Sequence, residues 1–338
     1  MATRRLTDGL GAWLVPIAVA ACLPLIASGN ALADTIHVPD DYPTIQAAIN
    51  AAVDGDEIIV HPGTYLEQID FLGRAIWLHS SDGPDLTTID ANETGSVVSC
   101  VSGEGPATVL EGFTITGGTG TLFSAEPCGG GMFITDSFPT VINCFFKDNS
   151  AVDGEGGGIY AFGPYSSSGG ATIIDCLFTG NSAYDGSGGG ICNSHCDTTI
   201  TNCTFTDNSA CEGEGGGVCI AGVSKVGVTG CAFAGNTALY GVGGGMAITS
   251  ASSEGQVMVK DCVFADNTAR KGGGMYNHCD ATVTDCLFVE NIVNEERGAG
   301  DGGALYHDGP FAALECTDCL FVRNAVPHGE TGGGAYIL

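Results

Sequence analysis

A repeated pattern in the later part of the chain constrains its fold more than any other sequence feature. From residue 129 onward the chain repeats Cys-x-Phe-x-x-Asn, a short loop, Gly-Gly-Gly and an apolar residue, at intervals of 24 to 33 residues. Repetition at such a period is typical of a solenoid, in which each repeat forms one coil. Seven copies keep three positions: Cys144, Cys176, Cys203, Cys231, Cys262, Cys286 and Cys319; Phe146, Phe178, Phe205, Phe233, Phe264, Phe288 and Phe321; and Asn149, Asn181, Asn208, Asn236, Asn267, Asn291 and Asn324.

The repeat unit predicts coils of short strands rather than helices. About 27 residues is too short for a strand–helix–strand unit, and β-branched runs such as 172–174 and 282–284 are bounded by Gly, Asn and Asp. Coils stacked about 4.8 Å apart place like residues on like residues. We therefore expect an all-β, right-handed, single-stranded parallel β-helix with Cys and Phe columns inside, an asparagine ladder at a bend and glycines at a corner.

Residues 34–118 lack the repeat and are expected to begin the same solenoid. Ile45, Ala48 and Ile49 share one face of a short helix that would cap the first coil, and irregular strands follow it. Residues 119–338 are expected to form the repeat coils and to stop in mid-coil. Two alternatives follow for this open coil: it pairs with another chain, or the sequence is truncated.

The first 33 residues have the layout of a secretory signal peptide. Arg4 and Arg5 precede an apolar run over 12–27, and an A-x-A site ends at Ala33. This layout predicts bacterial export to a secreted or cell-surface location. A lipoprotein anchored at Cys22 is the less favoured alternative, because residues 23–27 stay apolar. No membrane span is expected in the mature chain, since no later apolar run is long enough.

Charge limits the partners that the protein can have. The 338 residues include 39 acidic and 10 basic side chains, which gives a formal net charge of −29. Nucleic-acid binding depends on basic side chains that neutralise phosphates, so no nucleic-acid partner is expected.

Two sets of residues resemble known families. Gly-Gly-apolar segments such as Gly157-Gly158-Ile159, alternating with Phe-x-x-Asn, resemble the repeats of chlamydial polymorphic outer-membrane proteins. The opening at 43–49 and 61–65 resembles the start of bacterial pectin-lyase-like β-helix proteins. The resemblance implies the β-helix fold. It leaves the chemistry open, because that superfamily includes lyases, hydrolases, esterases, adhesins and proteins without known activity.

No catalytic or cofactor-binding residue is predicted. Gly63-Thr64-Tyr65-Leu66-Glu67 matches the first, largely structural motif of pectin methylesterases, but the residues that carry that chemistry have no counterpart. The favoured function is therefore an exported, non-catalytic, adhesin-like recognition or structural module at the cell surface, with a polysaccharide or another surface protein as partner. The alternative is a polysaccharide-active enzyme, a pectate-lyase-like lyase or a glycoside hydrolase.

One candidate metal site follows from the repeat register. Asp153, Asp185 and Glu212 stand nine residues after the column cysteine in three successive coils, and Glu155 and Glu214 flank the same corner. Carboxylates about 5 Å apart repel each other by roughly 1 kcal/mol in water. Either the side chains splay into solvent, or a structural Ca²⁺, which accepts six to eight oxygens in flexible geometry, bridges the coils.

One candidate disulfide follows from the same register. Cys192 and Cys219 stand two residues after a Gly triplet, on adjacent coils, where they are expected to face outward. The coil spacing of about 4.8 Å lies within the Cα separation of about 4.4–6.8 Å that a disulfide tolerates.

Overall fold

The computed structural model describes residues 33–163, 169–222, 225–249, 257–294, 301–309, 312–327 and 332–337. The chain divides into two compact units, Met1–Leu32 and Ala33–Leu338. The first unit, with the predicted signal sequence and Cys22, lies outside the described residues. The second unit holds the whole of the described structure.

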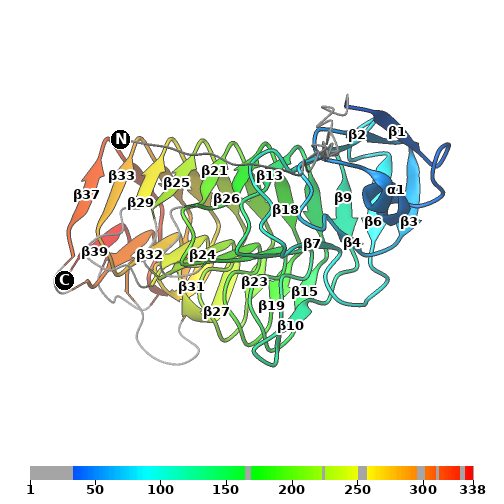
Figure 1. Ribbon diagram of the computed structural model, residues 1–338. Coiled ribbons are helices and arrows are strands. Elements are labelled where there is room, and N and C mark those ends of the chain that lie inside the picture. Colours follow the sequence, from blue (N-terminus) through cyan, green and yellow to red (C-terminus); the bar gives the residue numbers. More distant parts are fainter. Residues whose placement is uncertain are drawn as a thin grey trace, which may run out of the picture. The chain divides into compact units, whose positions relative to one another are not determined.

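Three long parallel sheets run through the second unit, and each coil contributes one strand to each sheet in turn (Figure 1). Sheet A consists of β1 (Thr35–Val38), β2 (Glu57–Val60), β5 (Trp77–Ser80), β8 (Val109–Glu111), β13 (Thr140–Ile142), β17 (Thr172–Ile174), β21 (Thr199–Thr201), β25 (Val226–Thr229), β29 (Val257–Lys260), β33 (Ala281–Thr284) and β37 (Leu314–Thr317). Sheet B consists of β3 (Gly63–Leu66), β6 (Thr87–Asp90), β9 (Thr114–Thr116), β14 (Phe145–Lys147), β18 (Leu177–Thr179), β22 (Thr204–Thr206), β26 (Ala232–Ala234), β30 (Val263–Ala265), β34 (Leu287–Val289) and β38 (Leu320–Val322).

Sheet C completes each coil. It consists of β4 (Ile69–Asp70), β7 (Val98–Cys100), β12 (Met132–Thr135), β16 (Ile159–Phe162), β20 (Ile191–Ser194), β24 (Val218–Ala221), β28 (Met246–Ile248), β32 (Met275–Asn277), β36 (Leu305–His307) and β39 (Ala335–Ile337). A shorter parallel sheet lies between B and C in the chain: β15 (Ser150–Ala151), β19 (Ser182–Ala183), β23 (Ser209–Ala210), β27 (Thr237–Val242), β31 (Thr268–Lys271) and β35 (Ile292–Val293). The predicted parallel β-helix is confirmed.

The phenylalanines form the centre of the core. All seven stack ring on ring, with centroids 4.7 to 5.0 Å apart and planes within 9° of parallel. The column cysteines lie beside them, and six of the seven are buried, whereas Cys319 is half-buried. Burial is the main reason why the pKa of the Cys144 thiol rises to about 12, so this thiol behaves as a small apolar group.

The asparagines form a continuous column of hydrogen bonds at the bend after sheet B, which is compatible with the expected ladder. Asn208 illustrates the pattern: its side-chain amide donates to the carbonyl oxygen of Phe178 and to Oδ1 of Asn236, both at 3.0 Å. Its own Oδ1 accepts from the backbone and side-chain nitrogens of Asn181, at 3.0 and 2.9 Å. Buried backbone groups at the bend thereby gain partners that the short strands do not supply.

The glycine corner is a point of close approach between coils. Gly156 has φ of +68°, in the region that favours glycine, and the following Gly157 lies against the next coil. A Cβ at Gly157 would come within 2.4 Å of the Ser182 carbonyl oxygen and 2.6 Å of that of Gly189. Any side chain here would force the coils apart.

Helix α1 (Ile45–Ala51) buries Ile45, Ala48 and Ile49 and packs against β1, β2 and β4. Figure 1 shows it at the end of the solenoid that holds β1 and β3. The Glu67 carboxylate accepts from the backbone N–H groups of Ile45 (2.8 Å) and Gln46 (3.0 Å). The esterase-like motif at 63–67 therefore has a structural use in this chain, because its glutamate satisfies the start of the capping helix.

We predict that Asn208→Ala lowers the free energy of unfolding by about 3 kcal/mol or more, because four buried hydrogen bonds lose a partner. The matched control is Asn324→Ala, at the half-buried last position of the column, where water can replace the lost partners. Urea unfolding followed by circular dichroism measures both. Equal midpoint shifts in the two variants would contradict the prediction.

Candidate functional site

The outer face of sheet C carries the two candidate cysteines, Cys192 and Cys219. One outward position of each strand stacks in register along this face, and it differs from coil to coil. The column reads Phe133, Tyr160, Cys192, Cys219, Ala247, Tyr276, Tyr306 and Tyr336. Its first four positions form an apolar, buried half, whereas the second half begins with Ala247 and continues with three tyrosines.

The apolar half forms a second, smaller hydrophobic cluster outside the main core. Cys128, Phe133, Tyr160, Cys192 and Cys219 are all buried in it. An antiparallel hairpin of β10 (Thr121–Phe123) and β11 (Glu126–Cys128) contributes to its cover. The ring centroid of Phe123 lies 5.7 Å from that of Phe133 and 6.0 Å from that of Tyr160.

The structure brings Cys192 and Cys219 together as expected from the register, and both are free thiols in it. They face away from the main core, yet the apolar cluster buries them completely. The Cys192 thiol donates to Oε2 of Glu155 at 3.6 Å. A hydrogen bond with Cys219, followed by burial, raises the pKa of Cys192 well above its usual range.

The acidic corner holds the five carboxylates that were candidates for calcium. Asp153, Asp185 and Glu212 are exposed, whereas Glu155 and Glu214 are half-buried. Partial desolvation, a hydrogen bond with Asp153 and the charges of Asp153 and Glu212 raise the pKa of Asp185. In the part of the chain that the structure describes, no group of three or more His, Cys, Asp or Glu side chains is placed to hold one metal ion. The corner thus brings the carboxyl groups of Asp153 and Asp185 into contact.

Glu155 has a different environment from the exposed carboxylates of the corner. The pKa of Glu155 is raised, mainly because the side chain is partly buried. The negative charges of Glu126 and Glu214 raise it further. The hydrogen bond from Cys192 acts in the opposite direction.

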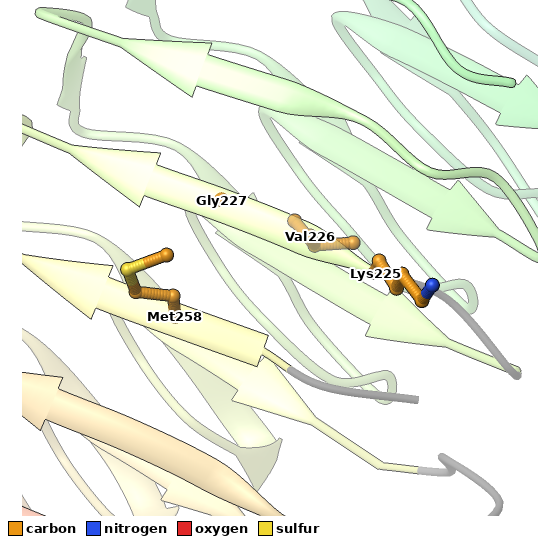
Figure 2. A pocket seen from close by; sticks show the side chains of 4 residues that line it. All are labelled: Lys225, Val226, Gly227 and Met258. Atoms are coloured by element: carbon orange, nitrogen blue, oxygen red, sulfur yellow. The ribbon is translucent and has the colours of Figure 1, made fainter. Parts of the chain in front are cut away.

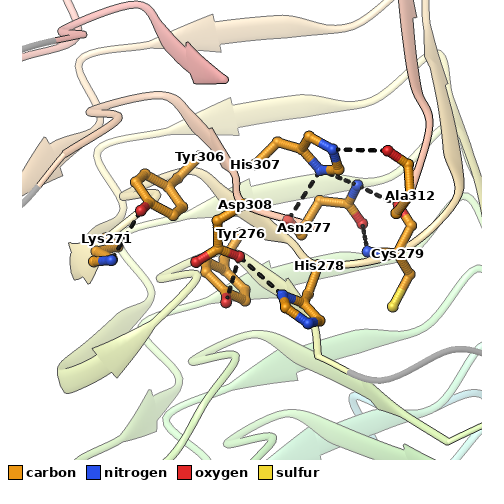
Figure 3. A network of polar contacts seen from close by, with 9 residues as sticks. All are labelled: Lys271, Tyr276, Asn277, His278, Cys279, Tyr306, His307, Asp308 and Ala312. Carbon is orange, nitrogen blue, oxygen red and sulfur yellow. Dashed lines mark hydrogen bonds and ion pairs between the residues drawn. The ribbon is translucent and has the colours of Figure 1, made fainter. Parts of the chain in front are cut away.

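The second half of the sheet C face carries a polar network between coils (Figure 3). Asp308 accepts from the Tyr276 hydroxyl at 2.8 Å and contacts Nδ1 of His278 at 2.9 Å. Lys271 donates to the Tyr306 hydroxyl at 2.9 Å, and its ammonium lies 4.4 Å from the centre of that ring. These contacts join the coil of β32 to that of β36.

Buried polar groups continue this network towards the interior. His307 is buried, and its Nδ1 lies 3.0 Å from Nδ2 of Asn277, whose amide also donates to the Cys279 carbonyl oxygen at 2.7 Å. Sequence analysis did not find the network, because its partners come from different coils and their residue types are not constant along the repeat.

The outer face of sheet A has a shallow depression between coils. Figure 2 shows Lys225, Val226 and Met258 around Gly227. Gly227 leaves open space, since a Cβ there would meet no atom within 4 Å. Val226 and Met258 are the apolar residues that line the depression, and Lys225 is its basic residue.

Two protein-family models match the chain. A family described as right handed beta helix region matches residues 165–338, and one described as Chlamydia polymorphic membrane protein repeat matches residues 143–161. No curated protein matches the chain. A solved structure, ORF18 of Geobacillus virus E2, is similar with a TM-score of 0.40 and 13% identity over 88% of this chain. The chain spans 62% of the length of that viral protein. Within the described ranges, no helix is long and apolar enough to cross a membrane.

We predict that Glu155→Gln raises the melting temperature at pH 7. A carboxyl group whose pKa is higher in the folded than in the unfolded state destabilises the folded state while it is charged. This destabilisation is complete at pH values above the raised pKa. It disappears as the pH falls to 4.5, the usual pKa of the glutamate side chain. The gain in the variant should therefore shrink over that interval. Exposed Glu315→Gln is the control, and a gain that persists unchanged below pH 4.5 would contradict the explanation.

The Cys192–Cys219 disulfide stays a prediction. Oxidation with glutathione disulfide should join the two thiols, because they are neighbours in register on adjacent coils. Mass spectrometry of a non-reduced digest should then detect a linked peptide pair. Recovery of both cysteines in alkylated form after oxidation would rule the bond out.

The calcium site also stays a prediction. Millimolar Ca²⁺ at constant ionic strength should raise the melting temperature by a few degrees relative to a chelator, because a bound cation offsets the repulsion between Asp153 and Asp185. Asp185→Asn should lose most of this response. Identical melting curves with Ca²⁺ and with chelator would exclude a stabilising site.

Proposed function

Because the chain belongs to the right-handed β-helix family, we propose that it acts as an exported, non-catalytic, adhesin-like recognition module at the cell surface. One observation carries the proposal: the inward columns are constant from coil to coil, whereas the outward positions vary. Solenoids with this division use a uniform interior to present an extended, variable binding surface.

Sheet B shows the division most clearly. Phenylalanine occupies the inward position of its last seven strands. The outward neighbour one residue earlier changes in size and polarity: Phe145, Leu177, Thr204, Ala232, Val263, Leu287 and Leu320. The interior therefore holds the fold, and the surface is free to carry specificity.

Two further features support the surface location. The match to the Chlamydia polymorphic membrane protein repeat suggests a surface protein, and the layout of residues 1–33 suggests export by a cleaved signal peptide rather than a lipid anchor at Cys22. We propose a polysaccharide or another surface protein as partner. The formal net charge of −29 argues against nucleic acid.

The enzyme alternative rests on the polar network of sheet C. Asp308 engages Nδ1 of His278, which orients the imidazole and leaves Nε2 available for proton transfer. The His278 side chain is 44% exposed, so a substrate can reach it. A polysaccharide lyase or glycoside hydrolase needs a group that transfers a proton, and His278 is the candidate for that role in the enzyme alternative.

One screen separates the two functions. The purified protein is tested, with Ca²⁺ present, against neutral, amine-bearing and acidic polysaccharides and against cell-surface proteins, for binding and for release of unsaturated or reducing ends. Binding without new ends is the expected result. Release of new ends that His278→Ala abolishes would establish the enzyme instead, and absence of binding to every probe would overturn the recognition module.

A further inference from the structure

The outer face of sheet A carries an exposed tryptophan near the start of the solenoid. Trp77 lies in β5, and the residue is 42% exposed. The chain has one other tryptophan, Trp13, within the predicted signal peptide. Exposure alone would not indicate a site, because single exposed apolar side chains are common on protein surfaces.

The orientation of the Trp77 ring is fixed by polar neighbours in its own strand and in an adjacent coil. Its indole N–H donates to Oε2 of Glu111 in β8 at 2.9 Å. The ring stacks on that of His79, with centroids 4.2 Å apart and planes 26° from parallel. His79 in turn contacts Oε1 of Glu57 in β2 through Nε2 at 3.0 Å, and Thr35 of β1 donates to the other oxygen of Glu57. Four strands thus hold one indole.

Such an arrangement differs from an exposed side chain that only covers the sheet. Met258 lies in the same outward column, six strands further along sheet A, and is 49% exposed, with a flexible side chain. The fixed indole has little side-chain entropy left to lose when a ligand stacks on it. It also has carboxylate oxygens beside it that can accept hydrogen bonds.

We propose that Trp77, His79, Glu57 and Glu111, here called the Trp77 platform, bind a saccharide ring that carries no acidic group. The apolar C–H face of a sugar would stack on the exposed part of the indole, as flat apolar surfaces do on aromatic rings. Sugar hydroxyl or ammonium groups would donate to the oxygens of Glu57 and Glu111.

Charge selects the class of sugar. Two carboxylates flank the indole, and the whole chain carries a formal net charge of −29, so a uronate would be repelled. Neutral and amine-bearing saccharides are not repelled, and an ammonium group gains from the same field. This inference rests on the proposed recognition function and names its ligand class.

The test uses isothermal titration of the full chain with three defined probes: cello-oligosaccharides (neutral), chitosan oligosaccharides (amine-bearing) and oligogalacturonates (acidic). The neutral and amine-bearing probes should bind. Trp77→Ala should weaken their binding about tenfold or more, through loss of the stacking surface. Trp77→Leu, which keeps apolar bulk without a flat ring, should have a similar effect. Met258→Ala is the matched control and should leave affinity unchanged.

A second variant separates stacking from charge. Glu111→Gln keeps an oxygen that accepts from the indole N–H but removes the negative charge. It should weaken binding of the chitosan probe more than binding of the cello-oligosaccharide probe. Circular dichroism confirms that each variant is folded.

The outcomes distinguish this inference from the proposed function. Saccharide binding that both Trp77 variants leave unchanged, or preferential binding of oligogalacturonate, overturns the Trp77 platform. If the chain binds a surface protein but none of the three probes, the Trp77 platform is also overturned, whereas the proposed recognition function is supported. Binding of nothing overturns both.

Discussion

The whole structure depends on the vertical register between coils, in which each side chain lies directly on its counterpart one coil away. The asparagine column fixes this register, since each amide bonds both to the next asparagine and to a backbone carbonyl of the preceding coil. Neutral groups gain from such stacking, because phenylalanine rings pack face to face and amides donate to amides. Stacking of charged groups is destabilising, because like charges are brought to the same short spacing and repel each other.

The turn before each asparagine shows how the sequence avoids this repulsion between stacked like charges. The residue before the asparagine has positive φ in all seven repeat coils. In the first five of these coils, aspartate and glycine alternate at this position: Asp148, Gly180, Asp207, Gly235 and Asp266. A Cβ at Gly180 would lie 2.5 Å from Oδ1 of Asp148, so each aspartate occupies the space that glycine leaves. In the last two coils Glu290 and Arg323 take these places and form an ion pair. Asp153 and Asp185 do stack at the acidic corner, and there the pKa of Asp185 is raised.

The repeat made the interior predictable from sequence and left most of the surface unpredictable. The same residue types recurring in coil after coil indicate both a coil and its register, so the β-helix and strands such as 172–174 and 282–284 could be predicted. Among the described residues, no other coil carries an antiparallel hairpin like that at 121–128. That this hairpin would help to cover Cys192 and Cys219 could therefore not be predicted. The Trp77 platform was missed for a similar reason. Its strands are separated by 22, 20 and 32 residues, and such irregular spacing hides which side chains become neighbours.

The same irregularity explains why a recognition site fits the first coils better than the later ones. In the repeat coils, inward phenylalanine, asparagine and cysteine and close-packed glycines occupy much of each unit. The early coils lack these columns and place Glu57, Trp77 and Glu111 on three neighbouring strands. Outward side chains of a β-helix contribute little to its core, so the face can exchange residues at small cost in stability. Large, polar and aromatic groups can therefore collect on the outer face of sheet A while the stacked interior remains unchanged.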